Sequence, residues 1–493
     1  MKTIGELARL VKGAELIGDP ETEIYGIEHD SRKVGKGTLF VCIPGFHVDG
    51  HKFIPQAVEA GASAILTTRD LEAMDGTAVL KVKDLSAALD AIVPFFHDYP
   101  ARSMRMIGIT GTNGKTTTSY ILRSILRNAG FKVGLIGTIQ IMIEEESLPI
   151  HNTTPDVVEL QHILAVMRDK GMDYVVMEVS SHALDQNRVA GIEFDTAVFT
   201  NLTQDHLDYH KTLENYKLAK ARLFDMLGRE GTKKGKTAVV NADDAAGETM
   251  LAHADCERIT YGIQQEASLH AEDIHVRADG TELALCGTFG RLPLNLRLTG
   301  IFNVYNVMAA TGAALAEGIP AERIAKTLQD FASVPGRFEM VDAGQDFFVI
   351  VDYAHTPDGM ENVLRTARQI AKKRILTVFG CGGDRDRTKR PIMGRIAAEL
   401  SDIVLATSDN PRSEDPMAIL KDVEAGVMEK IGKKHHECIA DRRTAIFRAV
   451  ELAESDDVVV ILGKGHENYQ ILKDKTIHFD DKETAREAMG GKK

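Results

Sequence analysis

The sequence predicts an α/β protein with three domains. These are a small α/β N-terminal domain (residues 1–98), a central P-loop ATPase-like domain of parallel strands with a β-rich patch (99–336), and a C-terminal doubly wound, Rossmann-like domain (337–493). Two observations support this prediction. A strand, a glycine-rich loop and a helix follow one another over residues 106–126. After residue 337, apolar strands alternate with amphipathic helices, as in a doubly wound sheet.

The N-terminal region shows the short alternating elements of a small α/β domain. Apolar residues at helical spacing predict a helix over 4–11, a strand follows at 38–43, and a second helix contains residues 57–60. The loop Asp30-Ser31-Arg32 precedes the strand. Its short polar groups and arginine could hold a phosphorylated or sugar ligand, but a solvated turn is an equally good interpretation.

The clearest chemical signal is the stretch Thr-Gly-Thr-Asn-Gly-Lys-Thr that opens the central domain. Gly111 and Gly114 would let backbone N–H groups close around a phosphate, and the helix that follows adds a favourable dipole. Lys115 would reach the terminal phosphates, and the Thr116 hydroxyl would contact Mg²⁺. The usual pattern has a glycine where Ile109 stands, so an ordinary glycine-rich turn is the alternative. The position between strand and helix favours a phosphate-binding loop.

Two charged residues of the central domain stand in apolar surroundings. Glu178 interrupts the apolar strand 174–179, where a charge is costly unless it is paired or bound to a metal. Lys220 lies on the apolar stripe of a helix, four residues after Tyr216 and four before Phe224. It could extend from the edge of that stripe to solvent, or turn inward toward a site. The residues alone favour the solvent-directed lysine.

The last domain presents polar clusters where its strands end. Strands are predicted near 347–353, 374–380, 402–407, 436–440 and 457–462. The clusters are Asp352–Pro357, Gly382–Asp386, Asp409–Arg412 and Gly463–Glu467. Open α/β sheets bind ligands at the carboxyl ends of their strands, so four clusters at one edge predict a binding site. Any one cluster alone would more often be a capped turn.

The composition restricts the possible partners and compartment. Lys and Arg number 59 against 72 Asp and Glu, a net charge of −13, so we expect no nucleic-acid partner. The five cysteines are scattered, without a CxxC pair, which suits a reducing compartment. No signal peptide and no apolar run of membrane-spanning length is evident. We therefore expect a cytoplasmic protein without a membrane span.

Six motifs together resemble the Mur ligase family, and within it the branch that adds meso-diaminopimelate. The resemblance covers essentially the whole chain and is very specific. The motifs are Thr-Gly-Thr-Asn-Gly-Lys-Thr at 110–116, Asn-Thr-Thr-Pro at 152–155, Met-Glu-Val-Ser-Ser-His at 177–182, Asn-Leu-Thr-Gln-Asp-His-Leu-Asp-Tyr-His at 201–210, Asp-Tyr-Ala-His-Thr-Pro at 352–357 and Asp-Asn-Pro-Arg at 409–412.

The resemblance implies an ATP-dependent ligase of peptidoglycan precursor synthesis in the cytoplasm. The substrates would be UDP-MurNAc-L-Ala-D-Glu, meso-diaminopimelate and ATP, with Mg²⁺ as cofactor, and the enzyme would be a monomer. ATP would convert the D-Glu side-chain carboxylate into an acyl phosphate, which the amine of diaminopimelate would then attack. The first domain would hold the UDP end of the substrate, the second ATP and Mg²⁺, and the third the amino acid.

The resemblance also implies four groups of site residues. The UDP-linked substrate would contact Ser31, Asn152, Thr153, Thr154, Ser180, Gln186 and Arg188. ATP would contact Gly111, Thr112, Asn113, Gly114, Lys115, Thr116, Thr117, Asn306, Arg337 and Asp352. Mg²⁺ would lie among Thr116, Glu178, His206 and Lys220, with Lys220 carbamylated, and catalysis would rest on Lys115, Glu178, His206 and Lys220. Diaminopimelate would contact Arg385, Asp409, Asn410, Pro411, Arg412, Gly463 and Glu467.

Three other functions remain open at this point. The nearest is the same ligation with L-lysine, which lacks the second carboxylate that Arg412 could grip; Arg412 could instead cap the next helix or pair with Glu414. A folylpolyglutamate synthetase would share the phosphate loop, but should lack a first domain like residues 1–98. A non-catalytic nucleotide-binding module would not need Glu178, His206 and Lys220.

Overall fold

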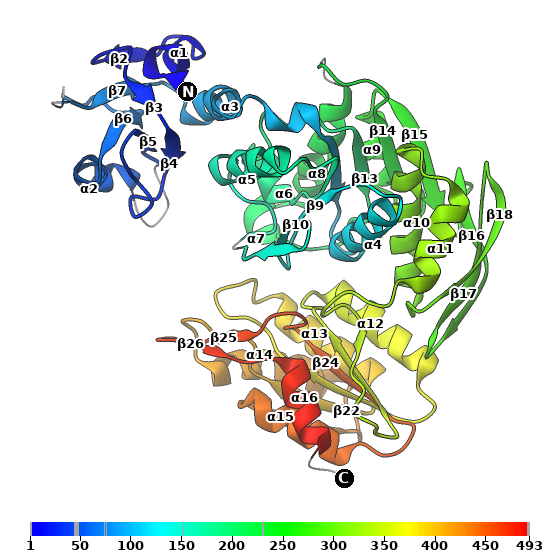
Figure 1. Ribbon diagram of the computed structural model, residues 1–493. Coiled ribbons are helices and arrows are strands. Elements are labelled where there is room, and N and C mark those ends of the chain that lie inside the picture. Colours follow the sequence, from blue (N-terminus) through cyan, green and yellow to red (C-terminus); the bar gives the residue numbers. More distant parts are fainter. Residues whose placement is uncertain are drawn as a thin grey trace. The chain divides into compact units, whose positions relative to one another are not determined.

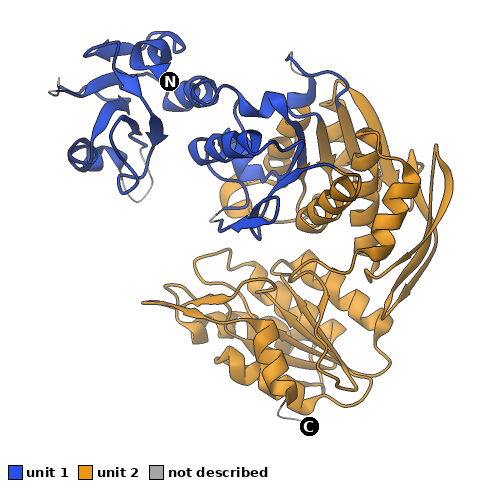
Figure 2. Cartoon of the chain, viewed as in Figure 1, with its two compact units in different colours: residues 1–108, 131–195, 226–236 blue, residues 109–130, 196–225, 237–493 orange. Residues whose placement is uncertain are grey.

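The computed structural model describes residues 2–43, 49–72, 74, 76–150, 152–228 and 231–490. Their contacts divide the chain into two compact units (Figure 2). Unit 1 comprises residues 1–108, 131–195 and 226–236, and unit 2 comprises 109–130, 196–225 and 237–493. The predicted α/β class is confirmed, because parallel strands alternate with helices in both units. The predicted domain limits at residues 98 and 336 stay a prediction.

The first part of unit 1 is a five-stranded sheet with helices packed on it (Figure 1). Its strands, in spatial order, are β2 (Glu15–Ile17), β7 (Ala78–Lys81), β6 (Ala62–Thr67), β5 (Thr38–Val41) and β4 (Gly26–Glu28). All neighbours are parallel except β2 and β7. The helices are α1 (Ile4–Arg9), α2 (Ile54–Glu59) and α3 (Leu85–Phe96), and the short strands β1 (Lys2–Thr3) and β3 (Glu23–Ile24) pair beside them.

The remainder of unit 1 supplies one side of the central sheet. The strands, in order, are β11 (Glu146–Leu148), β10 (Ile141–Ile143), β9 (Val133–Ile136), β12 (Tyr174–Glu178) and β8 (Arg105–Thr110), whose last two residues belong to unit 2. The other elements are the 3₁₀ turn η2 (Pro100–Ser103) and the helices α5 (Val157–Asp169) and α6 (Ser181–Asp185), whereas the 3₁₀ turn η1 (Gly50–Phe53) precedes α2 in the first part of the unit. Asp156 caps α5 by accepting the Val158 and Glu159 N–H groups, which fixes where this helix begins.

Unit 2 begins with the helix of the phosphate loop and a run of neighbouring strands. The strands are β13 (Thr196–Phe199), β14 (Thr237–Asn241), β15 (Glu257–Gly262), β16 (Leu269–Arg277), β17 (Gly280–Gly287) and β18 (Gly290–Leu296). The helices are α4 (Lys115–Asn128), α7 (Leu207–His210), α8 (Leu213–Gly228), α9 (Gly247–Ala252), α10 (Ile301–Ala316) and α11 (Ala321–Asp330). The antiparallel strands β16 to β18 confirm the predicted β-rich patch.

The last part of unit 2 is a doubly wound sheet, as predicted. Its strands, in order, are β19 (Glu339–Met340), β20 (Phe348–Asp352), β24 (Val458–Leu462), β21 (Ile375–Phe379), β22 (Ile403–Thr407) and β23 (His435–Ile439). Only the edge strand β19 is antiparallel. The other elements are α12 (Pro357–Ile370), α13 (Lys389–Leu400), α14 (Pro416–Lys430), α15 (Arg442–Leu452), α16 (Asp481–Gly490) and the hairpin of β25 (Tyr469–Ile471) and β26 (Thr476–His478).

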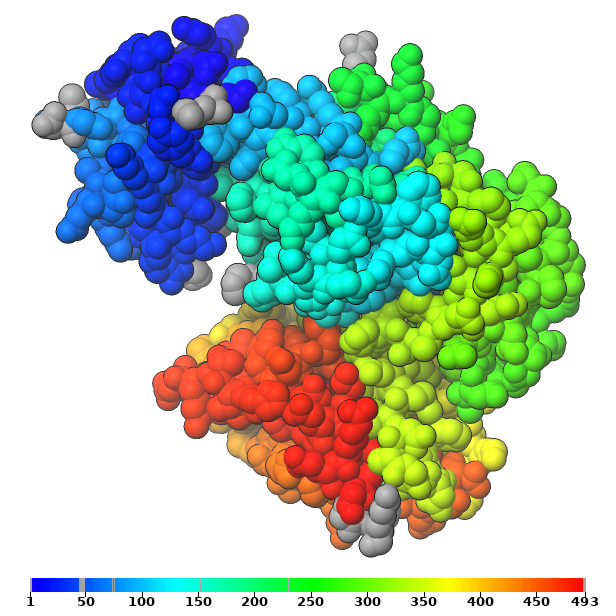
Figure 3. Space-filling view, viewed as in Figure 1, coloured from blue at the N-terminus to red at the C-terminus, as the bar shows by residue number. Residues whose placement is uncertain are grey.

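Helices cover both faces of this sheet (Figure 1). The side chains of α12, α13 and α14 pack on one face with Val404 and Val460, and those of α15 and α16 pack on the other with Leu405 and Val459. Successive strand residues point to opposite faces, and helices bury both of these faces. The strands are therefore continuous apolar runs in the sequence. The space-filling view shows the α16 region, in red, at the surface (Figure 3). Among the described helices, none is both long and apolar enough to cross a membrane.

A buried ion pair joins the two helices of the second face. Arg442 begins α15, Asp481 begins α16, and neither side chain is exposed to solvent. The guanidinium donates to both carboxylate oxygens of Asp481, at 2.8 and 2.7 Å, and to the Leu462 carbonyl at 2.9 Å. Since Leu462 ends β24, this pair fixes the helices against a strand end on the predicted ligand edge.

We predict that Asp481→Asn destabilises the last domain strongly. The change leaves a buried guanidinium without its counter-charge, a loss of about 3–5 kcal/mol in the free energy of unfolding. Glu487→Gln is the matched control, because it removes the exposed pair between α16 and Arg443, which should cost at most about 1 kcal/mol. The chain has no tryptophan, so urea unfolding should be followed by circular dichroism. Equal midpoints for the two variants would contradict the prediction.

Candidate functional site

The predicted strand, loop and helix of the phosphate loop are present. β8 ends at Thr110 and α4 begins at Lys115. Gly114 has a φ of +86°, and a Cβ placed there would lie 2.3 Å from the Asn306 side-chain oxygen. A Cβ on Gly111 would lie 1.9 Å from Oγ1 of Thr200. Only glycine fits these two positions, so the loop backbone is set by close approach of its neighbours.

Asn201 holds the loop in its folded shape. Its carbonyl accepts the Thr112 N–H at 2.8 Å, its side-chain oxygen accepts the Asn113 N–H at 2.9 Å, and its amide donates to the Asn113 carbonyl at 3.1 Å. The Asn113 side chain donates to Asp358 on α12 at 2.6 Å. Burial raises the pKa of Asp358. The loop therefore contacts an element of the last domain through Asn113.

Two lysines donate to one carbonyl oxygen of the loop. Nζ of Lys115 lies 2.9 Å and Nζ of Lys220 lies 2.8 Å from the Gly111 oxygen. Lys220 is 1% exposed, and its Nζ lies 4.3 Å from the centre of the Tyr216 ring. Burial, together with the charge of Lys115, lowers the pKa of Lys220 well below its usual range, although Asp205 opposes this. The interpretation of Lys220 as a solvent-directed lysine is wrong, because its side chain ends inside unit 2 at the loop.

Tyr216 brings His206 to the same place. The His206 ring lies edge-on to the Tyr216 ring with centroids 6.0 Å apart, and the Tyr216 hydroxyl is 3.1 Å from Oγ1 of Thr112. Nε2 of His206 lies 3.5 Å from the Asp205 carboxylate. Burial acts to raise the pKa of Asp205, but nearby cationic groups, His206 first, outweigh it and lower that pKa. Lys220, His206 and the loop thus share Tyr216 as a common neighbour.

Arg337 and Asp352 occupy the start of the last domain. The Arg337 guanidinium donates to Oγ1 of Thr116 at 3.1 Å and lies 4.5 Å from the centre of the Tyr353 ring. Asp352 is buried and accepts the Phe338 N–H at 2.6 Å. Burial raises the pKa of Asp352, against the charge of Arg337. Asp352 holds the backbone next to Arg337, whereas Arg337 itself reaches the first turn of α4.

In unit 1, Glu178 obtains its partners from a loop forty residues away. Its side chain is fully buried, and its two oxygens accept the Thr138 N–H at 3.0 Å and the Thr138 hydroxyl at 2.9 Å. A Cβ on Gly137 would lie 2.3 Å from the Glu178 carboxylate. Oγ1 of Thr138 is also 3.1 Å from Oγ1 of Thr153. These contacts explain how one acid is tolerated in an apolar strand.

The same region gathers most residues predicted for the UDP-linked substrate. The Thr154 hydroxyl donates to the Glu178 carbonyl at 2.9 Å and accepts the Ser180 N–H at 3.1 Å. Arg188 donates to the Thr154 carbonyl at 3.1 Å and to the Gln186 side chain at 2.6 Å. Five of the seven predicted residues therefore lie in one network: Thr153, Thr154, Ser180, Gln186 and Arg188.

The other two predicted residues of this group have different settings. Asn152 is exposed at the start of the Asn-Thr-Thr-Pro stretch. Ser31 is nearly buried, and its hydroxyl donates to the Gln56 side chain at 3.0 Å. Asp30 beside it pairs with the exposed Arg32 side chain at 2.7 Å.

A second gathering of predicted residues lies at the carboxyl ends of β22 and β24. Asn410 accepts the amine of the fully buried Lys464 at 2.9 Å and donates to the Glu467 carboxylate at 2.9 Å. A Cβ on Gly463 would lie 2.5 Å from the Asp409 carboxylate. Burial raises the pKa of Glu467, with Lys464 opposing. Three polar side chains from two strand ends thus share one hydrogen-bonded cluster, and the Lys464 amine also lies 3.6 Å from the Asp409 carboxylate.

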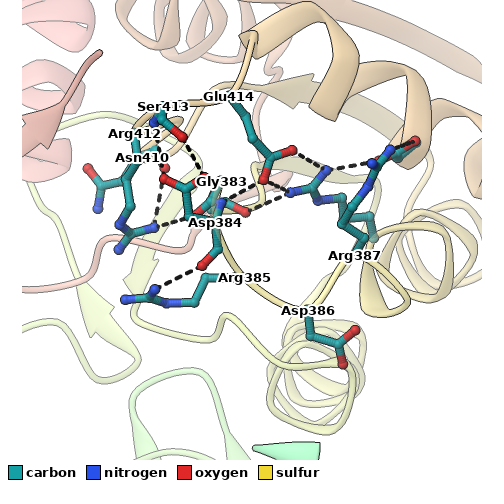
Figure 4. Close-up of polar contacts among 12 residues, drawn as sticks. Gly383, Asp384, Arg385, Asp386, Arg387, Asn410, Arg412, Ser413 and Glu414 are labelled. Atoms are coloured by element: carbon teal, nitrogen blue, oxygen red, sulfur yellow. Dashed lines mark hydrogen bonds and ion pairs between the residues drawn. The ribbon is translucent and has the colours of Figure 1, made fainter. Parts of the chain in front are cut away.

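Arg412 and Arg385 complete that edge (Figure 4). Arg412 donates to the Gly383 carbonyl at 2.9 Å, and Arg385 donates to the Asp384 carbonyl at 2.9 Å. Figure 4 shows the two guanidinium groups on the same side of these loops, away from Glu414. Burial and the nearby Arg412 lower the pKa of Arg385. Two cations held by carbonyl groups are suited to bind an anion.

The two structural alternatives for Arg412 are wrong. Glu414 pairs instead with Arg390, at 2.7 Å, and the side chain that caps α14 is Asp415. No described carboxylate forms an ion pair with Arg412. The neighbouring Pro411 has a backbone role, since its carbonyl accepts the Glu414 N–H at 3.0 Å.

Sequence reasoning missed several polar residues that support the predicted ones. Thr138, Tyr216, Arg390 and Lys464 each contact a predicted site residue or its loop. Lys464 stands within the predicted cluster Gly463–Glu467, so its place beyond a strand end was a usable signal. Thr138 and Arg390 lie outside every predicted motif, and their contacts depend on how distant segments meet.

Three family models match the chain. They are described as the Mur ligase family catalytic domain at residues 23–97, the Mur ligase middle domain at 109–314 and the Mur ligase glutamate ligase domain at 336–465. Together they extend over most of the chain.

Similar proteins include enzymes named UDP-N-acetylmuramoyl-L-alanyl-D-glutamate–2,6-diaminopimelate ligase. The one from Syntrophomonas wolfei is 46% identical over 99% of both chains, and the one from Bacillus cereus is 49% identical over 95% of both. A solved structure under the same name has a TM-score of 0.69 and 33% identity, covering 100% of this chain and 99% of that one. A folylpolyglutamate synthase of Mycobacterium tuberculosis shares the fold at a TM-score of 0.63 and 20% identity, over 76% of this chain and 92% of its own.

We predict that Gly114→Ala weakens binding of an ATP analogue. A left-handed non-glycine residue costs about 1–3 kcal/mol, or about 5–150-fold in affinity, and the new Cβ would also strike Asn306. Gly130→Ala is the control, because Gly130 follows the other end of α4 with a φ of +98° and no atom within 4 Å of its Cβ position. Calorimetric titration should show a weaker affinity for the ATP analogue in Gly114→Ala alone. Equal affinities in the two variants would refute the role of the loop.

Proposed function

Because the chain belongs to the Mur ligase family, we propose that it adds meso-diaminopimelate to the D-Glu side-chain carboxylate of UDP-MurNAc-L-Ala-D-Glu. The enzyme is an ATP-dependent peptide ligase of peptidoglycan precursor synthesis. The observation that carries this proposal is the agreement over nearly the whole chain with relatives named as 2,6-diaminopimelate ligases, at 46–49% identity. Arg412 and Arg385 at the edge of the last sheet, neither of which forms an ion pair with another described residue, support the choice of amino acid.

The reaction has to activate a carboxylate, which is a poor acyl donor. A carboxylate oxygen of D-Glu attacks the γ-phosphorus of ATP, so that ADP leaves and an acyl phosphate forms. The amine of diaminopimelate then attacks the acyl carbon and loses a proton, and inorganic phosphate leaves. The first step brings two anions together. The N–H groups of Gly111 to Thr117 and the charge of Lys115 offset this repulsion and stabilise the charge that develops.

The residues expected around Mg²⁺ suit that ion in most respects. Mg²⁺ prefers oxygen ligands, and the buried Glu178 carboxylate and Thr116 hydroxyl are such groups. A bare ammonium at Lys220 would not suit a cation. Its burial favours the neutral amine, which can add to CO₂, forming an N–C bond with loss of a proton, and so become an anion. When bound, Mg²⁺ would neutralise phosphate charge; His206 would complete the set.

We assign the remaining predicted residues on the same basis. Thr112, Asn113, Asn306, Arg337 and Asp352 position ATP, and Ser31, Asn152, Thr153, Thr154, Ser180, Gln186 and Arg188 hold the UDP-linked substrate. The domain limits are those predicted from the sequence, 1–98, 99–336 and 337–493. The enzyme acts in the cytoplasm as a monomer. Light scattering on the purified protein tests the monomeric state.

The choice of amino acid rests on charge. Diaminopimelate carries a second carboxylate that L-lysine lacks, and the forked guanidinium groups of Arg412 and Arg385 can bind it in a bidentate manner. With lysine bound, the two cations would face an ammonium instead. Asp409, Asn410, Pro411, Gly463 and Glu467 form the rest of this amino-acid site. The folylpolyglutamate alternative is disfavoured because that structure matches only 76% of the chain.

We predict a strong preference for meso-diaminopimelate over L-lysine. A site built around a polar partner rejects analogues that lack it by roughly 10⁴-fold or more in kcat/KM. Arg412→Ala should lose most of this preference while ATP affinity stays unchanged. Phosphate release and product mass with each amino acid measure both effects. Comparable kcat/KM for the two amino acids in the natural enzyme would overturn the proposed substrate, and absence of ligation would overturn the proposed function.

We predict that Lys220→Ala is nearly inactive and regains part of its activity with small carboxylic acids such as acetate, which replace the carbamate. Lys217→Ala is the matched control, because Lys217 lies on the same helix but pairs with Glu214 near the surface; it should behave like the natural enzyme. ¹³C NMR after addition of labelled CO₂ should show a carbamate signal that Lys220→Ala lacks. If the natural enzyme shows no carbamate signal and Lys220→Ala is not rescued by carboxylic acids, carbamylation of Lys220 is ruled out.

A further inference from the structure

Behind the loops of the amino-acid site lies a fully buried arginine. Arg390, the second residue of α13, is 0% exposed. Its guanidinium donates to both oxygens of Glu414, at 3.0 and 2.7 Å, to the Asp422 carboxylate at 2.9 Å, and to the Gly382 carbonyl at 3.3 Å. Arg390 therefore joins the loop after β21 to the loop after β22 from the inside.

Glu414 passes this constraint to the backbone at Asp384. Its Oε1, which accepts from Arg390, also accepts the Asp384 N–H at 2.6 Å. The Asp384 carboxylate in turn accepts the Ser413 N–H at 3.1 Å and the Ser413 hydroxyl at 2.7 Å. Asp384 has a φ of +53°. A non-glycine residue holds this conformation only where its surroundings impose it, and these contacts do so.

The backbone fixed in this way carries the two arginines of the site. The Gly383 carbonyl accepts from Arg412, and the Asp384 carbonyl accepts from Arg385. The Gly383 N–H also donates to the Asn410 carbonyl at 2.9 Å. The orientation of both guanidinium groups therefore depends on the position of two consecutive peptide groups. Glu414 accepts the N–H of the first of these peptide groups, the one between Gly383 and Asp384 (Figure 4). Arg390 in turn donates to both oxygens of Glu414.

We propose that Arg390 is a positioning residue for amino-acid selection: through Glu414 and Asp384, it sets the two carbonyl groups that aim Arg412 and Arg385 at the second carboxylate of the incoming amino acid. Arg390 itself does not touch the substrate. This inference rests on the proposed function, since it assigns a support to the same site. It adds a residue that none of the motifs contains.

The geometry requires the guanidinium and not just a positive charge. The planar fork contacts both oxygens of Glu414 while still reaching Asp422. A lysine amine is a single point charge on a flexible chain and cannot span these acceptors. The bond to Arg390 also contributes most to the lowered pKa of Glu414, so this carboxylate stays ionised.

The test compares Arg390→Lys with the control Arg387→Gln. Arg387 is exposed and its side chain forms hydrogen bonds only with Asp422 among the described residues, so the control disturbs the same neighbourhood without removing a hydrogen bond to Glu414. We expect Arg390→Lys to raise KM for meso-diaminopimelate about tenfold or more, because small misplacements of binding groups are costly. The preference of this variant for meso-diaminopimelate over L-lysine should fall by a similar factor. Its KM for ATP and its KM for the UDP-linked substrate should stay unchanged. Arg387→Gln should alter none of these.

A double-mutant comparison separates positioning from general damage. In an Arg412→Ala background, Arg390→Lys should change the preference for meso-diaminopimelate less than it does alone. One of the two arginines that Arg390 positions is then already absent. If Arg390→Lys does not fold by circular dichroism, Glu414→Gln makes the same test, since it keeps the shape and removes the charge. Unchanged KM and preference in the folded variants would overturn the inference while leaving the proposed function intact. Failure of the natural enzyme to ligate diaminopimelate would overturn the function itself.

Discussion

The Gly111 carbonyl oxygen, which accepts hydrogen bonds from Lys115 and Lys220, is the contact on which the phosphate site depends. The chain carries a net charge of −13, so positive charge for a triphosphate has to be concentrated locally. Lys115 supplies such a charge at the loop, and Lys220 donates to the same carbonyl oxygen. Burial and the charge of Lys115 lower the pKa of Lys220, which favours its neutral amine and leaves the positive charge on Lys115. The glycines at 111 and 114 and the clamp from Asn201 keep the loop in the shape that this arrangement needs.

Buried cations serve the last domain in a different way. Arg442, Lys464 and Arg390 are all fully buried, and each binds a carboxylate together with backbone or amide oxygens near the ligand edge of the sheet. A buried charge is costly unless it is paired, and removing its charged partner leaves a large penalty. These cations therefore join the loops at the strand ends to one another and to the neighbouring helices. The Gly383 and Asp384 carbonyl groups hold Arg412 and Arg385, and in the part of the chain that the structure describes neither guanidinium forms an ion pair.

The fold followed from the sequence where apolar periodicity was strong. The strands predicted near 374–380 and 457–462 differ from β21 and β24 by one residue at most at each end. Periodicity could not decide the direction of Lys220, because a helical stripe places a residue but not the end of a long side chain. The contact between Glu178 and Thr138 could not be predicted either. Thr138 lies forty residues earlier, and its position depends on how two loops meet. The domain limits and the substrate contacts stay predictions. A pattern of strands and helices does not define where one domain ends, and it does not describe bound ligands.

The central claim is that ATP activates the D-Glu carboxylate as an acyl phosphate before the amine attacks. The most direct test uses UDP-MurNAc-L-Ala-D-Glu with ¹⁸O in that carboxylate, together with ATP, Mg²⁺ and meso-diaminopimelate. The account predicts that one labelled oxygen moves into the released inorganic phosphate for each peptide bond formed, as mass spectrometry of the phosphate would show. Peptide product accompanied by unlabelled phosphate would contradict it.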